Sequence, residues 1–518
     1  MRKSISLLFL LSFGTAFSLH AQVTFNKRLH FGYPAALLTS IVPTDSCYYA
    51  TGLIADTLPP HKAGNIFVKF DLEGNVVYQK AITSSQRSYQ SWANTLIPLE
   101  NGGFALSGYT IDTLMRALFI RFDSNGDTLF TREYLNPNYP LANFFSPYDM
   151  KQTQDGGFVM ASWLGTSMVG NSDISVLKID SAGNEQWHKV FGYDLRERPE
   201  SILVAANGDI IVGAQRNNTN TTNNNYTYIT WIFGLNSQGG YKWSYYSPYG
   251  LLRDAANDMI LLDDGSLLVA SGIGTEYPRS SVNVVFFEKY LFRLDSNKNK
   301  EWDMEFPGQY PSDLTRTSNL ILIGDGSEFL AAGTSTYAYP SEESWTRKGW
   351  LYKGSTSGDS IWTREYVFLE NEQNSQIIYD IKETNDQGFI IVGESFDWTE
   401  QDSILQQAWL LKVDQYGCLV PGCQLVNTGE IPIQEINLVI YPNPAADYLN
   451  FYLHADPGKV DEGQFLIMDI SGKEIVRFES ASSGTTFIVP VMSYPAGTYV
   501  LQYLERGIVK TSKLFVIP

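Results

Sequence analysis

Aromatic and arginine side chains on long loops are the residues of this sequence best suited to hold a ligand. Indole and phenol rings stack on sugars, and arginine forms directed hydrogen bonds, so both residue types anchor ligands at exposed interfaces. Each can also serve only to pack one loop against another. Six of them lie in segments that we interpret as long connections, and we expect them to contact a ligand: Trp92, Tyr148, Trp163, Arg253, Arg316 and Trp398.

Patterns typical of catalysis or metal binding are scarce. Four histidines follow the first 21 residues, and none has the close spacing of a helical zinc motif: His30, His61, His188 and His454. The sequence has neither a G-x-S-x-G nucleophile elbow nor a phosphate-binding loop. "DSNGD" from Asp123 partly resembles a calcium loop, but it lacks the later glutamate, so a structural turn is favoured. We predict no metal and no cofactor. A secreted hydrolase or lyase acting on polysaccharide or peptide is the alternative function, because a carboxylate pair leaves no local motif.

A repeat carries these candidate residues. Each copy has a tight turn, such as "DSAGN" from Asp180. In six copies an aromatic residue follows seven positions after the turn's first residue, such as Trp187, and the copy that starts at Asp414 lacks it. The turns start 52 to 60 residues apart, at Asp71, Asp123, Asp180, Asn236, Asp295, Ser355 and Asp414. A second turn before each copy, such as "DGGFVMAS" from Asp155, reads as a hairpin entering a strand.

Four antiparallel strands in each repeat are the pattern of a β-propeller blade. The seven copies therefore predict an all-β, seven-bladed β-propeller over residues 22–423. The last copy lacks its fourth strand, and residues 23–31 resemble the missing one, so we expect this N-terminal strand to close the last blade. The connections are tight on one face of the ring and long on the other, and ligands usually bind on such long loops.

Composition and charge agree with an exported β protein. Aromatic residues form 14% of the chain, with 42 Gly and 22 Pro, which favours short strands joined by turns. Residues 1–21 read as a signal peptide, because Arg2 and Lys3 precede an apolar run too short to span a bilayer. The net charge of −18 argues against nucleic acid as a partner, and no later segment is long enough to span a membrane.

The three cysteines leave one pairing open. Cys418 and Cys423 form a local disulfide if the compartment is oxidising, and otherwise stay as two thiols near the end of a domain. Cys47 has no obvious partner.

A different domain ends the chain. Residues 424–435 read as a linker, and the alternating strands of residues 436–518 predict a small immunoglobulin-like β-sandwich. Four blocks there occur in a fixed order: "YPNPAADYLN", "DISGKEI", "YPAGTYVLQY" and "KTSKLFVIP". In order and spacing they resemble the type A C-terminal sorting domain of proteins exported by the type IX secretion system of Bacteroidota. An ordinary binding sandwich is the alternative.

That resemblance implies passage across the outer membrane, contact with the type IX secretion machinery through residues 436–518, and a secreted or cell-surface location. The first part of the chain resembles, more loosely, secreted bacterial repeat proteins, which implies architecture but not activity. Together the sequence predicts an exported β-propeller scaffold that binds a glycan or protein ligand through long loops on one face. A purely structural role at the cell surface is a third possibility.

Overall fold

The structure is a computed structural model, and part of the chain is described in it. The predicted signal peptide, most of the predicted linker, Arg253 and Trp398 lie outside the described residues. In the described part, one short helix occurs, η1 (Cys423–Leu425), and no helix is long and apolar enough to cross a membrane. The described residues are 22–55, 62–136, 144–165, 172–192, 196–218, 227–248, 255–279, 282–306, 316–338, 345–369, 374–397, 406–420, 423–425, 436–455, 463–470, 473–479, 487–505 and 508–517.

Tight turns capped by their own first residue join the strands. The Asp180 carboxylate accepts hydrogen bonds from the backbone N–H groups of Ala182 at 2.9 Å and Asn184 at 2.8 Å, and Gly183 has a φ of 80°. A side chain would strain the backbone at that φ, which explains the recurrent glycine. Five residues cap equivalent turns in the same way: Asp71, Asp123, Asn236, Asp295 and Asp414. The acidic residues of the repeat build turns, as predicted.

The aromatic residue of a repeat packs against the turn of the next repeat. A Cβ added to Gly239 would lie 3.0 Å from the Trp187 ring, and one added to Gly417 would lie 2.8 Å from the Trp362 ring. Such close approach requires a residue without a side chain. The aromatic and the glycine of the repeated motif therefore join neighbouring sheets.

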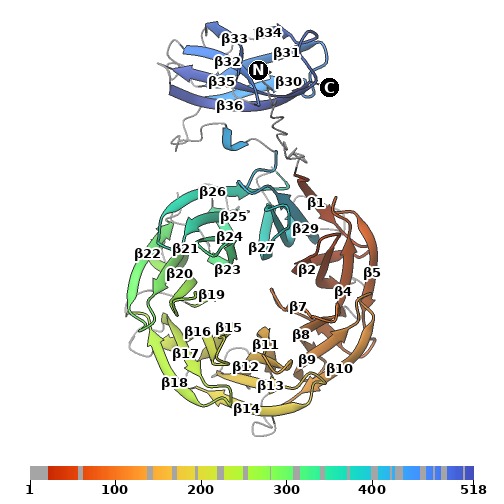
Figure 1. Cartoon of the computed structure of the whole chain (residues 1–518), viewed down its shortest axis with the longest axis vertical. Helices are drawn as coiled ribbons and strands as arrows, with labels where there is room; N and C mark the ends of the chain where they lie inside the picture. The colour runs from red at the N-terminus through yellow and green to blue at the C-terminus, as the bar shows by residue number, and fades with distance from the viewer. Residues whose placement is uncertain are drawn as a thin grey trace, which may run out of the picture.

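The strands of residues 25–413 form antiparallel groups that follow one another around a ring (Figure 1). The first group is β2 (Ala35–Pro43), β3 (Tyr48–Ala55), β4 (Ala63–Phe70) and β5 (Val76–Ile82). In the second group β6 (Ser88–Gln90) and β7 (Leu96–Pro98) both pair with β8 (Phe104–Ile111), which is followed by β9 (Met115–Phe122) and β10 (Thr128–Tyr134). The third is β11 (Phe144–Gln152), β12 (Phe158–Gly165), β13 (Ser172–Ile179) and β14 (Glu185–Phe191).

The remaining groups repeat this order. They are β15 (Glu197–Val204), β16 (Ile210–Asn218), β17 (Thr227–Leu235) and β18 (Tyr241–Tyr246); β19 (Asp258–Leu261), β20 (Leu267–Arg279), β21 (Val282–Leu294) and β22 (Lys300–Phe306); β23 (Arg316–Ile323), β24 (Glu328–Ala338), β25 (Trp345–Ser355) and β26 (Ser360–Tyr366); and β27 (Asn374–Glu383), β28 (Phe389–Asp397) and β29 (Gln406–Val413). The first strand of each group lies nearest the ring centre, and in each of the first six groups the last strand lies at the rim (Figure 1).

Apolar cores lie between successive groups. In one of them Val159 and Val176 of the third group pack with Ile210, Val212 and Phe233 of the fourth, and all five side chains are buried. Burying each such side chain contributes roughly 1.5–3 kcal/mol before conformational entropy is counted. Contacts between consecutive sheets therefore hold the ring together.

The N-terminal strand completes the last group, because β1 (Phe25–Leu29) pairs antiparallel with β29. The Asn26 side chain accepts a hydrogen bond from the indole N–H of Trp409 at 2.6 Å and donates one to the carbonyl of Val367 at 2.8 Å. A Cβ added to Gly74 would lie 2.6 Å from the Phe25 ring, so Phe25 occupies the place of the repeated aromatic. The two ends of the ring are thus joined by backbone pairing and by side chains.

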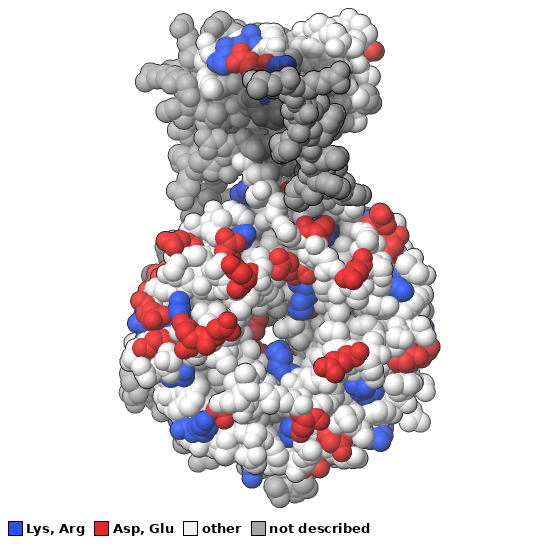
Figure 2. Space-filling view, in the orientation of Figure 1, with Lys and Arg blue, Asp and Glu red and all other residues white. Residues whose placement is uncertain are grey.

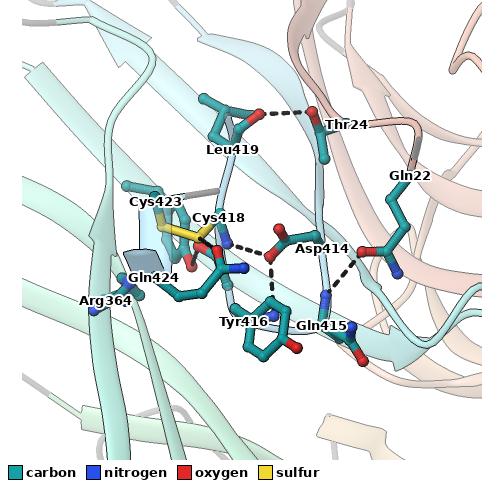
Figure 3. Close-up of a disulfide and its surroundings, with 12 residues drawn as sticks. Gln22, Thr24, Arg364, Asp414, Gln415, Tyr416, Cys418, Leu419, Cys423 and Gln424 are labelled. Carbon is teal, nitrogen blue, oxygen red and sulfur yellow. Dashed lines mark hydrogen bonds between the residues drawn. A yellow bond between two sulfur atoms is a disulfide. The ribbon is translucent and has the colours of Figure 1, made fainter. Parts of the chain in front are cut away.

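A disulfide between Cys418 and Cys423 lies beside this closure (Figure 3). Asp414 caps the turn before it, accepting hydrogen bonds from the backbone N–H groups of Tyr416 and Cys418. Thr24 donates a hydrogen bond to the carbonyl of Leu419 at 2.6 Å, which ties the N-terminal segment to the disulfide loop. Cys47 is a buried free thiol.

Replacing Asn26 with Ala should lower the free energy of unfolding by about 1–3 kcal/mol, because the fully buried indole N–H of Trp409 then lacks its acceptor. Urea unfolding followed by tryptophan fluorescence measures this change. The matched control is Lys27→Ala on the same strand, where an exposed contact with Asn75 is removed and less than about 0.5 kcal/mol should be lost. Equal losses in the two variants would contradict the closure.

The C-terminal segment forms two further sheets. One contains β30 (Ile436–Tyr441), β31 (Tyr448–Ala455) and β34 (Phe487–Pro490), and the other contains β32 (Gly463–Asp469), β33 (Glu474–Glu479), β35 (Gly497–Glu505) and β36 (Ile508–Ile517). Phe451 of the first sheet packs with Phe465 and Tyr503 of the second in one buried core. This segment therefore has a hydrophobic core of its own.

Candidate functional site

The strands nearest the ring centre carry β-bulges. A bulge inserts one extra residue into a strand and redirects its side chain, and bulges are frequent beside binding sites. In five of these strands the pairing register skips one residue. The skipped residues are Thr39, Tyr148, Glu200, Ser318 and Tyr379.

Four of the skipped residues line a single cavity of about 150 Å³ at the centre of the ring: Tyr148, Glu200, Ser318 and Tyr379. Trp92, Asn94, Arg198, Asn257 and Asp258 also line it. The surface is hollowed at this position, with basic and acidic side chains around the opening (Figure 2). Pockets for whole drug-sized ligands measure roughly 300–1,000 Å³, so this cavity suits a group of about one ring. We call it the central pocket.

An aromatic stack forms one wall of the central pocket. The Trp92 ring lies 4.9 Å from the Tyr148 ring at an interplanar angle of 21°, and 5.8 Å from the Tyr109 ring. The Trp92 indole N–H donates a hydrogen bond to Ser146 Oγ at 2.8 Å, yet 38% of the Trp92 surface stays exposed. The indole is thus held in place while part of its surface remains accessible to a ligand.

An arginine continues the stack. The Arg198 guanidinium lies 5.5 Å from the centre of the Tyr148 ring and donates a hydrogen bond from Nε to Glu200 Oε1 at 2.7 Å. Burial opposes the charge on Arg198, but the attraction of Glu200 outweighs it and raises the pKa of Arg198 above its ordinary value. Tyr148, Arg198 and Glu200 together place an aromatic ring, hydrogen-bond donors and an acceptor within one pocket.

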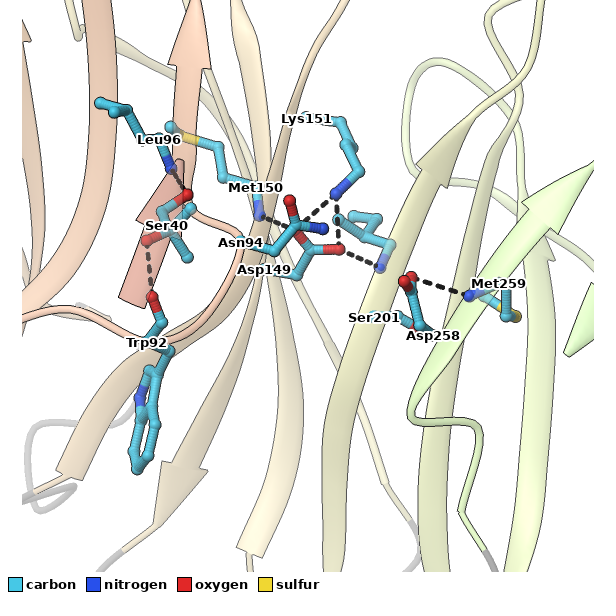
Figure 4. Close-up of polar contacts among 12 residues, drawn as sticks. Ser40, Trp92, Asn94, Leu96, Asp149, Met150, Lys151, Ser201, Asp258 and Met259 are labelled. Atoms are coloured by element: carbon cyan, nitrogen blue, oxygen red, sulfur yellow. Dashed lines mark hydrogen bonds and ion pairs between the residues drawn. The ribbon is translucent and has the colours of Figure 1, made fainter. Parts of the chain in front are cut away.

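Three buried aspartates link neighbouring groups around the pocket. Asp149 of β11 accepts hydrogen bonds from its neighbour Met150 at 2.7 Å and from Ile202 of β15 at 2.9 Å (Figure 4). Asp258 and Asp380 repeat this geometry, accepting from Leu320 of β23 and Ile41 of β2, each at 2.8 Å. Each carboxylate bridges two inner strands through backbone N–H groups. We call these three residues the clamp aspartates.

Two clamp aspartates have a lysine two positions later. Lys151 lies 2.7 Å from Asp149, and Lys382 forms an ion pair with Asp380. The third has Ile260 at the equivalent position. Burial raises the pKa of Asp258 to about 6; Lys151 opposes this shift and Asp149 adds to it. Asp258 is therefore the clamp aspartate whose charge is least compensated.

The carboxyl groups that line the pocket already form hydrogen bonds or ion pairs within the protein. A glycosidase needs one carboxyl group to donate a proton and another to act as base or nucleophile. Both oxygens of Asp258 accept backbone hydrogen bonds, and Glu200 is paired with Arg198. His188 contacts Ser175 in a sheet, but Ser175 is fully buried, and burial lowers the pKa of His188 to about 4. No cluster of three potential metal ligands occurs in the described part of the chain.

The structure brings two of the six predicted ligand residues together, because Trp92 and Tyr148 stack in the central pocket. Trp163 lies within β12, is buried and packs on Phe144, away from that pocket. Arg316 begins β23, but its side chain is outside the described set, as are Arg253 and Trp398 altogether.

Sequence reasoning missed Arg198, Glu200 and the clamp aspartates. A usable signal existed, because "YDMK" ending at Lys151 and "YDIK" ending at Lys382 recur in corresponding strands. In both, the tyrosine is the bulged residue and the aspartate is the clamp. Charges recurring within an otherwise apolar strand indicate a channel lining or an interstrand bridge.

Comparison with protein families gives a match at the C-terminus. Residues 439–517 match the family described as the secretion system C-terminal sorting domain. The match supports the type IX sorting domain predicted from the four sequence blocks and implies a secreted protein that contacts that secretion machinery. Among curated proteins, no sequence matches the chain.

Several solved structures are similar in outline. Polysaccharide lyase Uly1 has 9% identity and a TM-score of 0.45, over 76% of this chain and 100% of that chain. An alpha-L-arabinanase of Penicillium chrysogenum has 9% identity and a TM-score of 0.36, over 76% and 98% of the two chains. An alpha-L-arabinofuranosidase of Fusarium graminearum has 9% identity and a TM-score of 0.39, over 76% and 98%. These scores are too low to bear on fold or function.

Proposed function

We propose that the chain is an exported binding scaffold whose central pocket holds one ring of a glycan. Its parts are a signal peptide (1–21), a seven-bladed β-propeller (22–423), a linker (424–435) and an immunoglobulin-like sorting domain (436–518) that directs the protein to the medium or the cell surface. The observation that carries the proposal is the fixed, partly exposed indole of Trp92 on the Tyr148 ring.

Aromatic faces bind sugars because the C–H groups of a sugar ring pack on the π surface and the hydroxyl groups remain free for hydrogen bonds. The polar groups needed for those bonds line the same pocket, among them Asn257, Ser318 and Tyr379. Because Asp258 and Glu200 already accept hydrogen bonds from the protein, the pocket favours binding of a glycan over its hydrolysis. The proposal moves the site from the loop tips to the ring centre, and long loops can extend it.

Replacing Trp92 with Ala should weaken glycan binding about tenfold or more, which corresponds to ~1.4 kcal/mol, because the stacking surface is lost. A glycan array probed with the purified chain identifies ligands, and calorimetry compares the variants. Tyr241→Ala is the matched control, since Tyr241 is an exposed aromatic on the rim strand β18. Failure of every glycan to bind, or equal binding by Trp92→Ala, would contradict the proposal. Turnover of a bound glycan would favour the hydrolase or lyase alternative.

A further inference from the structure

The three clamp aspartates share a backbone geometry but differ in their counter-charges. Asp149 and Asp380 each pair with a lysine two residues later in the same strand. In the part of the chain that the structure describes, no lysine or arginine forms an ion pair with Asp258, and its strand carries Ile260 at the lysine position. The pairing of a clamp aspartate with a lysine two residues later thus occurs at Asp149 and Asp380 and is absent at Asp258.

Around Asp258 the other carboxylates have ion-pair partners, and Lys151, the lysine that attracts Asp258, is itself paired with Asp149. On β11, Asp149 is balanced by Lys151; on β27, Asp380 is balanced by Lys382. On β15, Glu200 is balanced by Arg198. Burial of an uncompensated carboxylate is costly, and a cation brought next to it recovers part of that cost. The raised pKa of Asp258, about 6, agrees with this geometry.

Asp258 also lines the pocket that Trp92 and Tyr148 wall. A ring stacked on the Trp92 indole and a cationic substituent beside Asp258 would share one cavity of about 150 Å³. A free cation without a ring would use only the carboxylate, and a neutral ring would use only the stack. A ligand with both a ring and a cationic group would therefore bind more tightly than a ligand with either one alone.

We propose that the central pocket recognises an amino sugar, a sugar ring whose single ammonium group supplies the ion-pair partner that Asp258 lacks. This inference rests on the proposed glycan-binding function and names the ligand class of the same site. Neutral sugars then bind more weakly because Asp258 stays without an ion-pair partner, and acidic sugars bind more weakly still because they add a negative charge beside it.

Calorimetric titration of the purified full chain at pH 7 tests the proposal with three probes of one ring size: glucosamine, glucose and N-acetylglucosamine. Glucosamine should bind at least tenfold more tightly than the other two, because its amine is charged and theirs is absent or acylated. Lowering the pH to 5 should weaken glucosamine binding, because Asp258 is protonated below its pKa of about 6 while the amine keeps its charge.

Three variants separate charge recognition from the fold. Asp258→Asn removes the negative charge and should abolish the preference for glucosamine over glucose. Ile260→Lys restores the pattern of Lys151 and Lys382, so the internal ammonium group should compete with the ligand and also abolish the preference. Ile260→Met fills the same place without charge and should keep the preference. Thermal melting of each variant checks that the ring is folded.

The outcomes distinguish the two proposals. Equal binding of glucosamine and glucose by the folded wild-type chain overturns amino-sugar recognition and leaves the glycan-binding scaffold standing. No binding of any probe, together with an empty glycan array, overturns both. Preference for glucosamine that survives in Asp258→Asn or Ile260→Lys also overturns the assignment of Asp258 as the recognising group.

Discussion

An Asp380→Ala variant is expected to lose about 3–5 kcal/mol of unfolding free energy, the largest effect of any single substitution considered. Asp380 accepts backbone hydrogen bonds from Ile381 and Ile41, each at 2.8 Å, and a hydrogen bond from Ser40 Oγ at 3.2 Å. It also forms an ion pair with Lys382 and is 1% exposed. Its removal leaves buried backbone donors without their acceptor across the junction of the last and first groups, and the half-buried Lys382 ammonium group keeps only its hydrogen bond to Asn94.

Chemical denaturation followed by fluorescence measures this loss. Asp127→Ala is the control, because Asp127 forms a surface ion pair with Lys80 and should lose less than about 1 kcal/mol. The double variant Asp380→Ala with Lys382→Met should recover part of the stability, since the uncompensated ammonium group is then gone. A loss of unfolding free energy as small as that of the control would show that Asp380 contributes little to the stability of the ring closure.

Deleting residues 436–518 is expected to reduce export at least tenfold while leaving the ring folded. The deleted segment contains the matched sorting domain, and its core is formed by its own two sheets, so the ring loses no core residue. Immunoblots of medium, cell surface and periplasm measure the distribution in a host that has type IX secretion. The truncated chain should accumulate in the periplasm with an unchanged unfolding midpoint.

A gain-of-function control strengthens that test. Fusing residues 436–518 to an unrelated periplasmic protein should carry that protein to the surface or the medium. Normal export of the truncated chain would show that the sorting assignment is wrong. A collapse of the unfolding midpoint would show that the two parts of the chain depend on each other for stability.

The repeating part of the fold could be predicted because local chemistry repeats with it. Asp180 and Gly183 determine a tight turn between two strands, and Trp187 packs on the turn of the next repeat at Gly239. The recurrence of these residues therefore indicates the order of the strands. The closure by residues 23–31 followed from the same pattern, because Phe25 stands where the other repeats have their aromatic. In each case a short-range pattern determines a contact.

The central pocket could not be predicted from the sequence, and the reason is physical. A bulge shifts one residue out of the two-residue alternation, so Glu200 faces the pocket although no periodicity marks it. The pairing of Asp258 with Leu320 joins residues that are 62 positions apart in different groups. Trp92 and Tyr148 were proposed from the sequence because aromatic residues stand out there, whereas the charged residues that line the same pocket come together only through the arrangement of the inner strands around one centre.

The pairing of β1 with β29 also determines when the ring can close during folding. Asn26 and Trp409 are 383 positions apart, so a growing chain holds an unpaired first strand until nearly all of the ring has been synthesised. Closing so long a loop is slow and leaves strand edges exposed in the meantime. The sorting domain lies C-terminal to β29, the strand that pairs with β1, so a chain that ends before β29 has neither a closed ring nor a sorting domain.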